Sequence, residues 1–266
     1  MKPQLSPELR LLAHLELEPE APTLEFLHRI IREHQLRVPF ETLTKLIDYE
    51  PGRARGDFMP SMEEYVDRVV TRGAGGLCWT LARGLRELLH ALGFDAALMY
   101  MDPGHCCVRV EFPEGPQYAD VGYAAPIFRA YPLFESFTLE THRESFDYRV
   151  DGDAIQVTRN PGPTKHLDPT PRRLAELQPL ITAANDWTVP SSFLRRLVYA
   201  RYLDRVYTTL RDGVLTRYTG PDPQTVELSA DQIPAALADV FHADPDLYRE
   251  AAAVKRRHEP DPRPEC

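Results

Sequence analysis

One cysteine in this chain has the surroundings of a nucleophile. Cys78 follows the glycine-rich run GAGG at residues 73–76 and opens residues 79–92, which have the pattern and composition of a helix. A thiol at a helix N-terminus lies near the positive end of the helix dipole and near unpaired backbone N–H groups, and both favour the thiolate. The same N–H groups are placed to stabilise an oxyanion by hydrogen bonding. We therefore predict a nucleophilic thiolate here, against the alternative of a cysteine buried only for packing.

A histidine and an aspartate further along the chain complete a possible triad. His105 directly follows the turn sequence DPG at residues 102–104, and Asp120 lies in the next apolar stretch. A cysteine nucleophile needs an imidazole to take its proton, and the imidazole needs a carboxylate to fix its tautomer. The order Cys, His, Asp, with the cysteine on a helix and the other two on strands, is that of papain-like enzymes. The alternatives to a triad are that His105 is an ordinary surface or core histidine and that Asp120 is an aspartate of a turn or strand edge.

The strand pairing sets a geometric condition on this triad. If the loop PEGP closes a simple hairpin, Asp120 lies opposite Arg109 and His105 lies opposite Ala124. The offset between His105 and Asp120 is then four residues, or about 13 Å along a strand. A bulge, a different register or a strong twist must bring the two side chains together.

The elements that carry these residues change character near residue 94. Apolar residues recur at helical spacing over 9–15, 24–31 and 61–70, with Thr23 as an N-cap and Gly93 as a C-terminal glycine cap. From Phe94 the period becomes two, in short runs separated by turn signals. The prediction is a helical bundle followed by a sheet. The stretch PGPTKHLDPTP has four prolines in eleven residues and favours an irregular segment, with a boundary near residue 190.

The last part of the chain is predicted as a mixture of strand and helix. Residues 206–220 have the pattern of a hairpin around Asp212 and Gly213, and residues 233–241 that of a short helix. The tail RRHEPDPRPEC is expected to be frayed.

Bulk composition excludes several classes of protein. The chain has 266 residues, 43% of them apolar, so it can bury a substantial core. A formal charge of −9 gives no reason to expect a nucleic-acid partner. No apolar run approaches the length of a membrane span, and the charged N-terminus is unlike a signal peptide, which predicts a cytoplasmic protein that does not bind membranes. The cysteines suit neither a disulfide framework nor a zinc site, so no metal is expected; they are residues 78, 106, 107 and 266.

A set of motifs in a fixed order resembles the arylamine N-acetyltransferases. The likeness spans about residues 5–250 and joins VPFETL at 38–43, the turn before Cys78, LGF at 92–94, His105 opening a strand and DVGY at 120–123. The sequence PSSF at 190–193, the later hairpin and the closing helix also fit.

This resemblance implies a fold and an activity. The fold is α+β, with a helical bundle (residues 1–93), a β-rich middle domain (94–190) and a C-terminal α/β lid (191–266). The activity is ping-pong transfer of an acetyl or other acyl group from acetyl-CoA, or another pantetheine thioester, to an arylamine or other small-molecule amine. Cys78 is then the nucleophile, His105 the base and acid, and Asp120 the orienting carboxylate.

The chain departs from the family pattern around the nucleophile. Ala74 stands where the family usually has Arg, Trp79 opens the stretch WTLA in place of an acidic residue and Asn, and Ala124 replaces a glycine. These changes keep open an amide synthase of secondary metabolism that uses an acyl carrier protein as partner. A papain-like or transglutaminase-like amidase, and a scaffold without catalysis, are further alternatives.

Several other residues are secondary candidates. Trp79 would either narrow the acceptor pocket or belong to the core, and Glu41 would cap or pair with a loop near the site. Cys106 and Cys107 should point to opposite faces of one strand. Four arginines either hold the phosphates of a CoA or carrier arm or form a solvated face; they are Arg195, Arg196, Arg201 and Arg205.

Overall fold

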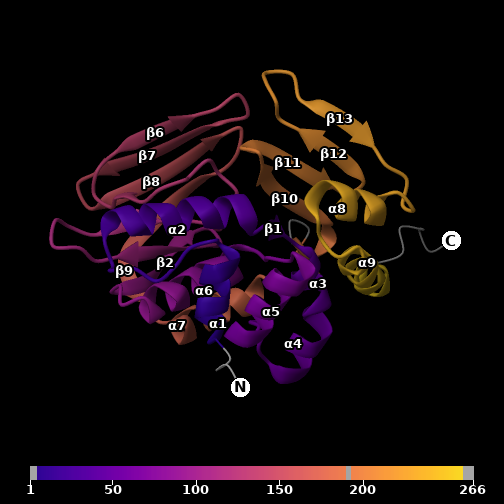
Figure 1. Cartoon of the computed structure of the whole chain (residues 1–266), viewed down its shortest axis with the longest axis horizontal. Helices are drawn as coiled ribbons and strands as arrows, with labels where there is room; N and C mark the ends of the chain where they lie inside the picture. The colour runs from indigo at the N-terminus through magenta and orange to yellow at the C-terminus, as the bar shows by residue number, and fades with distance from the viewer. Residues whose placement is uncertain (1–4, 190–192, 260–266) are drawn as a thin grey trace.

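A computed structural model describes residues 5–189 and 193–259 (Figure 1). The helices are α1 Pro7–His14, α2 Leu24–Arg37, α3 Leu43–Ile47, α4 Tyr49–Arg55, α5 Met62–Arg72, α6 Cys78–Ala91, α7 Leu174–Ala183, α8 Ile233–Phe241 and α9 Asp246–His258, with a 3-10 turn η1 at Phe193–Arg195. The strands are β1 Phe40–Glu41, β2 Ala96–Asp102, β3 His105–Val110, β4 Gln117–Ala119, β5 Tyr131–Pro132, β6 Phe137–Glu140, β7 Ser145–Asp151, β8 Ala154–Asn160, β9 Thr164–Arg172, β10 Val198–Leu203, β11 Val206–Arg211, β12 Val214–Arg217 and β13 Gln224–Glu227. The predicted α+β order, helices first and strands after, is confirmed.

Side-chain caps explain where the N-terminal helices begin. The Thr23 hydroxyl accepts a hydrogen bond from the Phe26 backbone N–H at 3.2 Å, so the predicted N-cap of α2 is confirmed. Helix α5 begins with a capping box, in which Ser61 and Glu64 each accept from the other's backbone N–H. At the end of α6, Gly93 takes the predicted left-handed conformation.

The strands of the described residues form two antiparallel sheets. The larger has the order β5-β4-β3-β2-β9-β8-β7-β6, and the smaller has the order β1-β10-β11-β12-β13. In Figure 1 the hairpins of β6–β8 and of β11–β13 lie above the N-terminal helices, while α8 and α9 flank the smaller sheet. Strand β1 joins the smaller sheet next to β10, so the segment before α3 ties the N-terminal helices to the C-terminal part of the chain.

Three hydrophobic clusters hold these layers together. The largest packs α1, α2, α5 and α6 against one face of β2 and β3, and a second fills the opposite face of the larger sheet. The third lies under the smaller sheet and joins α3 to α8 and α9. Cys106 belongs to the first cluster and Cys107 to the second, so the predicted opposite orientation of these neighbours is confirmed.

Two predictions about the chain's course are wrong. The stretch PGPTKHLDPTP is not irregular, because most of it is β9, which pairs with both β2 and β8. Its prolines are tolerated beside an irregular register between Leu98 and Tyr100 of β2, where the ladder is already interrupted. The start of the tail is helical, since α9 runs to His258. Residues 260–266, and residues 190–192 of the PSSF motif, lie outside the described part.

The predicted C-terminal elements are confirmed. Strands β11 and β12 pair as a hairpin around Asp212 and Gly213, which both have positive φ as such a turn requires. Helix α8 has the predicted bounds.

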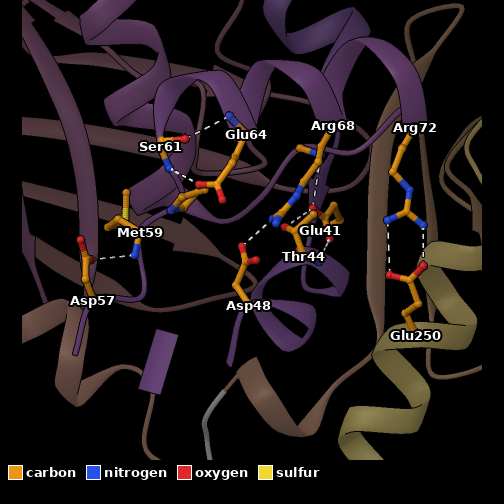
Figure 2. A network of polar contacts seen from close by, with 12 residues as sticks. Glu41, Thr44, Asp48, Asp57, Met59, Ser61, Glu64, Arg68, Arg72 and Glu250 are labelled. Carbon is orange, nitrogen blue, oxygen red and sulfur yellow. Dashed lines mark hydrogen bonds and ion pairs between the residues drawn. The ribbon is translucent and has the colours of Figure 1, made fainter. Parts of the chain in front are cut away.

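An arginine in α5 fixes the position of α9: Arg72 donates to Asp244 at 2.6 Å and to Glu250 at 2.9 Å. Figure 2 shows the Arg72–Glu250 pair across the two elements.

Candidate active site

Cys78 is the first residue of α6 and is held there by glycines. A Cβ atom on Gly75 would lie 1.9 Å from the Pro39 carbonyl oxygen, and one on Gly122 would lie 2.7 Å from the Cys78 Cα. The backbone can therefore approach this closely only without side chains at 75 and 122. Cys78 is 9% exposed, and its side chain faces the Gly104 carbonyl oxygen at 3.8 Å. The predicted position of the thiol at a helix N-terminus is correct.

The strand register brings His105 and Asp120 together. In the structure β3 and β4 pair Val108 with Ala119, so the register differs by two residues from the simple hairpin, and Arg109 lies opposite Tyr118 instead of Asp120. The loop between the strands is longer than PEGP alone, because β3 ends at Val110. Strand β4 ends before Asp120, whose carboxylate reaches the His105 ring with an Nε2–Oδ2 distance of 2.7 Å.

Asp120 is a buried carboxylate with a full set of donors. It is 1% exposed and accepts from His105, from the Tyr118 hydroxyl at 2.6 Å and from the Gly122 backbone N–H at 2.8 Å. A buried charge is costly unless it is paired and hydrogen-bonded, and this one is both. The Gln35 amide also donates to the Asp120 carbonyl oxygen at 3.3 Å, which fixes the backbone at this position.

The ring tautomer follows from these contacts. Since the Nε2–H of His105 is donated to Asp120, Nδ1 is the ring nitrogen left for Cys78. The His105 ring also packs nearly perpendicular to the Tyr123 ring, with ring centroids 4.4 Å apart, so the imidazole is held on two sides. His105 is 3% exposed, which shields the pair from water.

Burial and charge act in opposite directions on the pKa values of this pair. Burial alone would raise the pKa of the Cys78 thiol, but the hydrogen bond and positive charge of His105 outweigh it, helped by the Cys106 backbone N–H, and the pKa is lowered. Burial would lower the pKa of His105, yet the Asp120 carboxylate and the Cys78 sulfur raise it to about 9. These directions favour a thiolate–imidazolium pair near neutral pH.

A cavity of about 340 Å³ opens onto this pair. Its wall includes Trp79 and Phe193, with Lys45 and Tyr123 among the polar groups. Trp79 is 7% exposed, belongs to the main core and stacks on Tyr100 with ring centroids 6.1 Å apart. Trp79 is therefore both a core residue and part of the cavity wall. From the sequence alone, these two roles were alternatives.

Glu41 holds the loop before Cys78 in place through hydrogen bonds to its carboxylate. It is fully buried, and its carboxylate accepts from the Thr44 N–H at 2.9 Å and from the Thr44 hydroxyl at 2.5 Å (Figure 2). It also accepts from the Gly75 N–H at 3.2 Å. Burial raises its pKa above the ordinary value although these donors oppose the shift. The predicted capping role and loop contact of Glu41 are confirmed.

The arginines singled out from the sequence are not gathered at the Cys78 cavity. Arg195 donates to the Trp187 carbonyl oxygen at 3.2 Å and Arg201 to the Leu36 carbonyl oxygen at 2.8 Å. Arg205 lines a separate depression together with Arg201, away from Cys78. Arg196 is exposed. Within the described residues, the cavity beside Cys78 holds none of the four.

Sequence reasoning missed the cavity's own polar residues. Lys45, Arg143, Arg159, Lys165 and Arg211 line the cavity. They come from α3, β8, β9, β11 and the loop before β7, and no local motif links them. Only the family resemblance of VPFETL pointed toward the segment that carries Lys45.

Neither a metal centre nor a membrane span is found in the described part. Residues 5–189 and 193–259 contain no group of three or more His, Cys, Asp or Glu side chains arranged to hold a metal ion. Among these residues, no helix is long and apolar enough to cross a bilayer.

Comparison with known proteins finds similarity to N-acetyltransferases, in a family model and in solved structures. The family model described as N-acetyltransferase matches residues 23–246. The fold is similar to that of Mycobacterium marinum arylamine N-acetyltransferase in complex with CoA, with 19% identity, a TM-score of 0.75 and coverage of 94% of this chain and 98% of that one. The Salmonella typhimurium arylamine N-acetyltransferase is 19% identical, with a TM-score of 0.75 and coverage of 96% and 100%.

A third solved structure is similar to the same extent. A Bacillus cereus arylamine N-acetyltransferase, described as having a Cys-His-Glu catalytic triad, is 14% identical, with a TM-score of 0.74 and coverage of 91% of this chain and 100% of that one. No curated protein sequence matches the chain.

Proposed function

The chain belongs to the arylamine N-acetyltransferase family of acyltransferases, and from this premise we propose that Cys78, His105 and Asp120 are the catalytic triad of a ping-pong acyl transfer to an amine. The observation that supports the proposal most strongly is the 2.7 Å contact between the His105 ring and a fully buried Asp120, next to a thiol whose pKa is lowered. In this assignment residues 1–93 supply the nucleophile, residues 94–190 supply its base and carboxylate, and residues 191–266 form the lid.

The first half-reaction acylates the cysteine. The Cys78 thiolate attacks the carbonyl carbon of a thioester, and the carbonyl oxygen becomes an oxyanion near the backbone N–H groups that open α6. When the intermediate collapses, the bond to the donor sulfur breaks, and the His105 imidazolium gives its proton to the departing thiolate. The products are a free thiol and an acyl group on Cys78, with a neutral imidazole still held by Asp120.

The second half-reaction transfers the acyl group to the amine. The amine nitrogen attacks the Cys78 thioester, and His105 accepts the proton that the nitrogen loses. The carbon–sulfur bond breaks, the amide leaves, and the thiolate–imidazolium pair returns. Asp120 keeps one ring tautomer in both steps, since the Nε2–H stays on its carboxylate while Nδ1 exchanges protons.

The choice of donor rests on the relatives. The Mycobacterium marinum relative was solved in complex with CoA, and we extend that donor, as acetyl-CoA, to this chain. The triad of the Bacillus cereus relative has Glu in the carboxylate position, which supports a carboxylate partner for the histidine as the shared requirement. Here that carboxylate is Asp120.

Single-turnover kinetics test the proposal. Mixing the enzyme with acetyl-CoA without an amine should release one equivalent of CoA thiol per chain in a rapid burst, and adding an arylamine should restart the release. Cys78→Ser should show no burst. Continuous release without an amine would instead indicate a hydrolase, and the absence of a burst in the unmodified chain would refute acyl transfer through Cys78.

A further inference from the structure

Lysine is rare in this chain, and its placement is uneven. Four of the 31 Lys and Arg residues are lysines. Of the lysines that the structure describes, Lys45 and Lys165 line the cavity beside Cys78, and Lys255 lies on α9. A lysine differs from an arginine in having a nitrogen that can lose its proton and then act as a nucleophile. The cavity that holds the thiol therefore also holds amines that belong to the chain itself.

Hydrogen bonds fix the segment that carries Lys45 against the loop that leads to Cys78. The Glu41 backbone N–H donates to the Gly76 carbonyl oxygen at 3.0 Å, and the Glu41 carboxylate accepts from the Gly75 N–H at 3.2 Å. Lys45 follows Glu41 in α3, and Cys78 follows Gly76 at the start of α6. Because these two segments are bonded to each other, the side chains of Lys45 and Cys78 reach one cavity.

Two hydrogen bonds orient the nitrogen of Lys45. Nζ donates to the Ala184 carbonyl oxygen at 2.9 Å and to Asn185 Oδ1 at 2.8 Å. Both acceptors are neutral, so neither stabilises an ammonium as a carboxylate would. A neutral amine has two N–H groups and one lone pair, and these two acceptors satisfy both N–H groups. The lone pair is then the part of the nitrogen that is left for an electrophile.

Acylation of Cys78 removes a charge that helps to keep Lys45 protonated. Burial lowers the pKa of Lys45 to about 8, while the attraction of the Cys78 sulfur opposes this shift. Once the sulfur carries an acyl group it has no charge, so the pKa of Lys45 falls further. Near pH 7.5 roughly a quarter or more of this amine is then neutral, against roughly 0.1% for an ordinary lysine. The neutral amine is therefore most abundant when the thioester is present.

We infer that Lys45 is a self-acylation site, to which the acyl group of Cys78 moves slowly within one chain when no amine acceptor is present. This inference rests on the proposed acyl transfer. The Lys45 nitrogen attacks the thioester carbonyl carbon, a carbon–nitrogen bond forms and the carbon–sulfur bond breaks. The neutral imidazole of His105 accepts the proton that the nitrogen loses, which restores the thiolate–imidazolium pair. The products are an amide on Lys45 and a Cys78 that can be acylated again.

The same hydrogen bonds make this transfer slower than transfer to a substrate. They restrain the Lys45 nitrogen, whereas a free amine moves directly to the thioester. An acylated Lys45 has lost its charge and carries an added group in the cavity. The modification therefore marks chains that have been exposed to a donor without an acceptor.

Lys165, the other lysine of the cavity, lacks this combination of features. It lies on β9 and donates to the Pro103 carbonyl oxygen in an exposed hydrogen bond. The attraction of the Asp102 carboxylate helps to keep its ammonium charged after Cys78 has been acylated. The contacts therefore favour Lys45 as the internal acceptor, and Lys165 provides the matched control.

The test follows the unmodified chain with acetyl-CoA and no amine. The burst of CoA thiol from Cys78 acylation should be followed by a second, slower phase that ends at two equivalents per chain. Peptide mapping after treatment with hydroxylamine, which cleaves thioesters and leaves amides intact, should then find an acetyl group on Lys45. Lys255, whose ammonium lies 2.8 Å from the Glu259 carboxylate, is the internal reference and should stay unmodified over the same period.

Three variants separate internal transfer from direct attack on the donor. Cys78→Ala keeps Lys45 but forms no thioester, so Lys45 should stay unmodified. Lys45→Arg should give the burst of one equivalent without a second phase, whereas Lys165→Arg should still reach two equivalents. When Cys78→Ala and Lys45→Arg chains are mixed, Lys45 should also stay unmodified, because the transfer occurs within one chain.

The outcomes distinguish a failure of this inference from a failure of the proposed function. An arylamine present from the start should suppress acetylation of Lys45, which tests the inference without any variant. The absence of a burst in the unmodified chain would mean that acyl transfer through Cys78 itself fails. A normal burst with no later acetyl group on Lys45 would overturn the inference, as would equal acetylation of Lys45 in Cys78→Ala.

Discussion

Replacing His105 by glutamine should remove the charge that keeps the Cys78 thiol ionised. The pKa of His105 is about 9, so near neutral pH the ring is protonated and stabilises the thiolate through their hydrogen bond. Glutamine has a similar reach but carries no charge. Of the remaining influences on the thiol, burial raises its pKa and is larger than the lowering by the Cys106 backbone N–H. The variant should therefore hold a protonated thiol at pH values where the unmodified chain holds a thiolate.

The size of the effect follows from the ordinary thiol. With a pKa of about 8.5, such a thiol is only ~0.3% ionised near pH 6, so loss of the thiolate at that pKa would lower the reactivity roughly 300-fold. A thiolate of lower pKa is intrinsically less nucleophilic, which reduces the expected ratio to roughly 10- to 100-fold. The pH profile should also change: the variant's rate should rise about tenfold per pH unit between roughly pH 6 and 8. The rate of the unmodified chain, whose thiol pKa is lowered, should rise less steeply.

Alkylation by iodoacetamide, followed by peptide mapping, measures this directly. Mapping separates Cys78 from the other cysteines, and burial raises the pKa of Cys106 and Cys107, so these two serve as slow internal references. His90→Gln, at an exposed histidine of α6 whose ring contacts the Ala96 carbonyl oxygen, is the matched control. Equal rates and parallel pH profiles for the His105 variant and the unmodified chain would refute an ionised Cys78–His105 pair.

Three more substitutions test the supports of the site. Gly122→Ala places a Cβ 2.7 Å from the Cys78 Cα and should slow acylation by roughly 10- to 100-fold through misplacement of the nucleophile, measured in the burst assay; an unchanged burst rate would show that the close contact is not needed. Glu41→Gln replaces a buried acceptor of three donors by an amide and should cost about 1–3 kcal/mol of unfolding free energy in urea titration, whereas unchanged stability would contradict the capping role. Tyr118→Phe removes the 2.6 Å donor to Asp120 and should lower kcat about threefold to tenfold with the urea midpoint nearly kept, and full activity would mean that His105 and the Gly122 N–H suffice to orient the carboxylate.

The parts of the fold that were predictable from sequence are those set by local chemistry. Thr23 and Gly93 are where they were expected because caps and glycine turns act over a few residues. The place of Cys78 at the start of α6 follows from the same local chemistry. By contrast, β9 was missed because its prolines have the composition of a loop, and only pairing with β2 and β8 makes that stretch a strand.

The geometry of the site depended on non-local pairing. A two-residue change in register between β3 and β4 decides whether Asp120 meets His105 or Arg109, and nothing in the loop sequence selects it. The cations of the cavity could not be found for the same reason. Lys45 and Arg211 are far apart in the chain and meet only because β1 and the C-terminal strands share one sheet.

The covalent state of Cys78 during turnover tests the account most directly. After brief exposure to acetyl-CoA, peptide-resolved mass spectrometry should find one acetyl group, on the peptide that contains Cys78, and the group should disappear when an arylamine is added and reappear as the amide product. An acetyl group on a different residue, or an unmodified Cys78 under conditions in which amide is formed, would contradict transfer through this thiol.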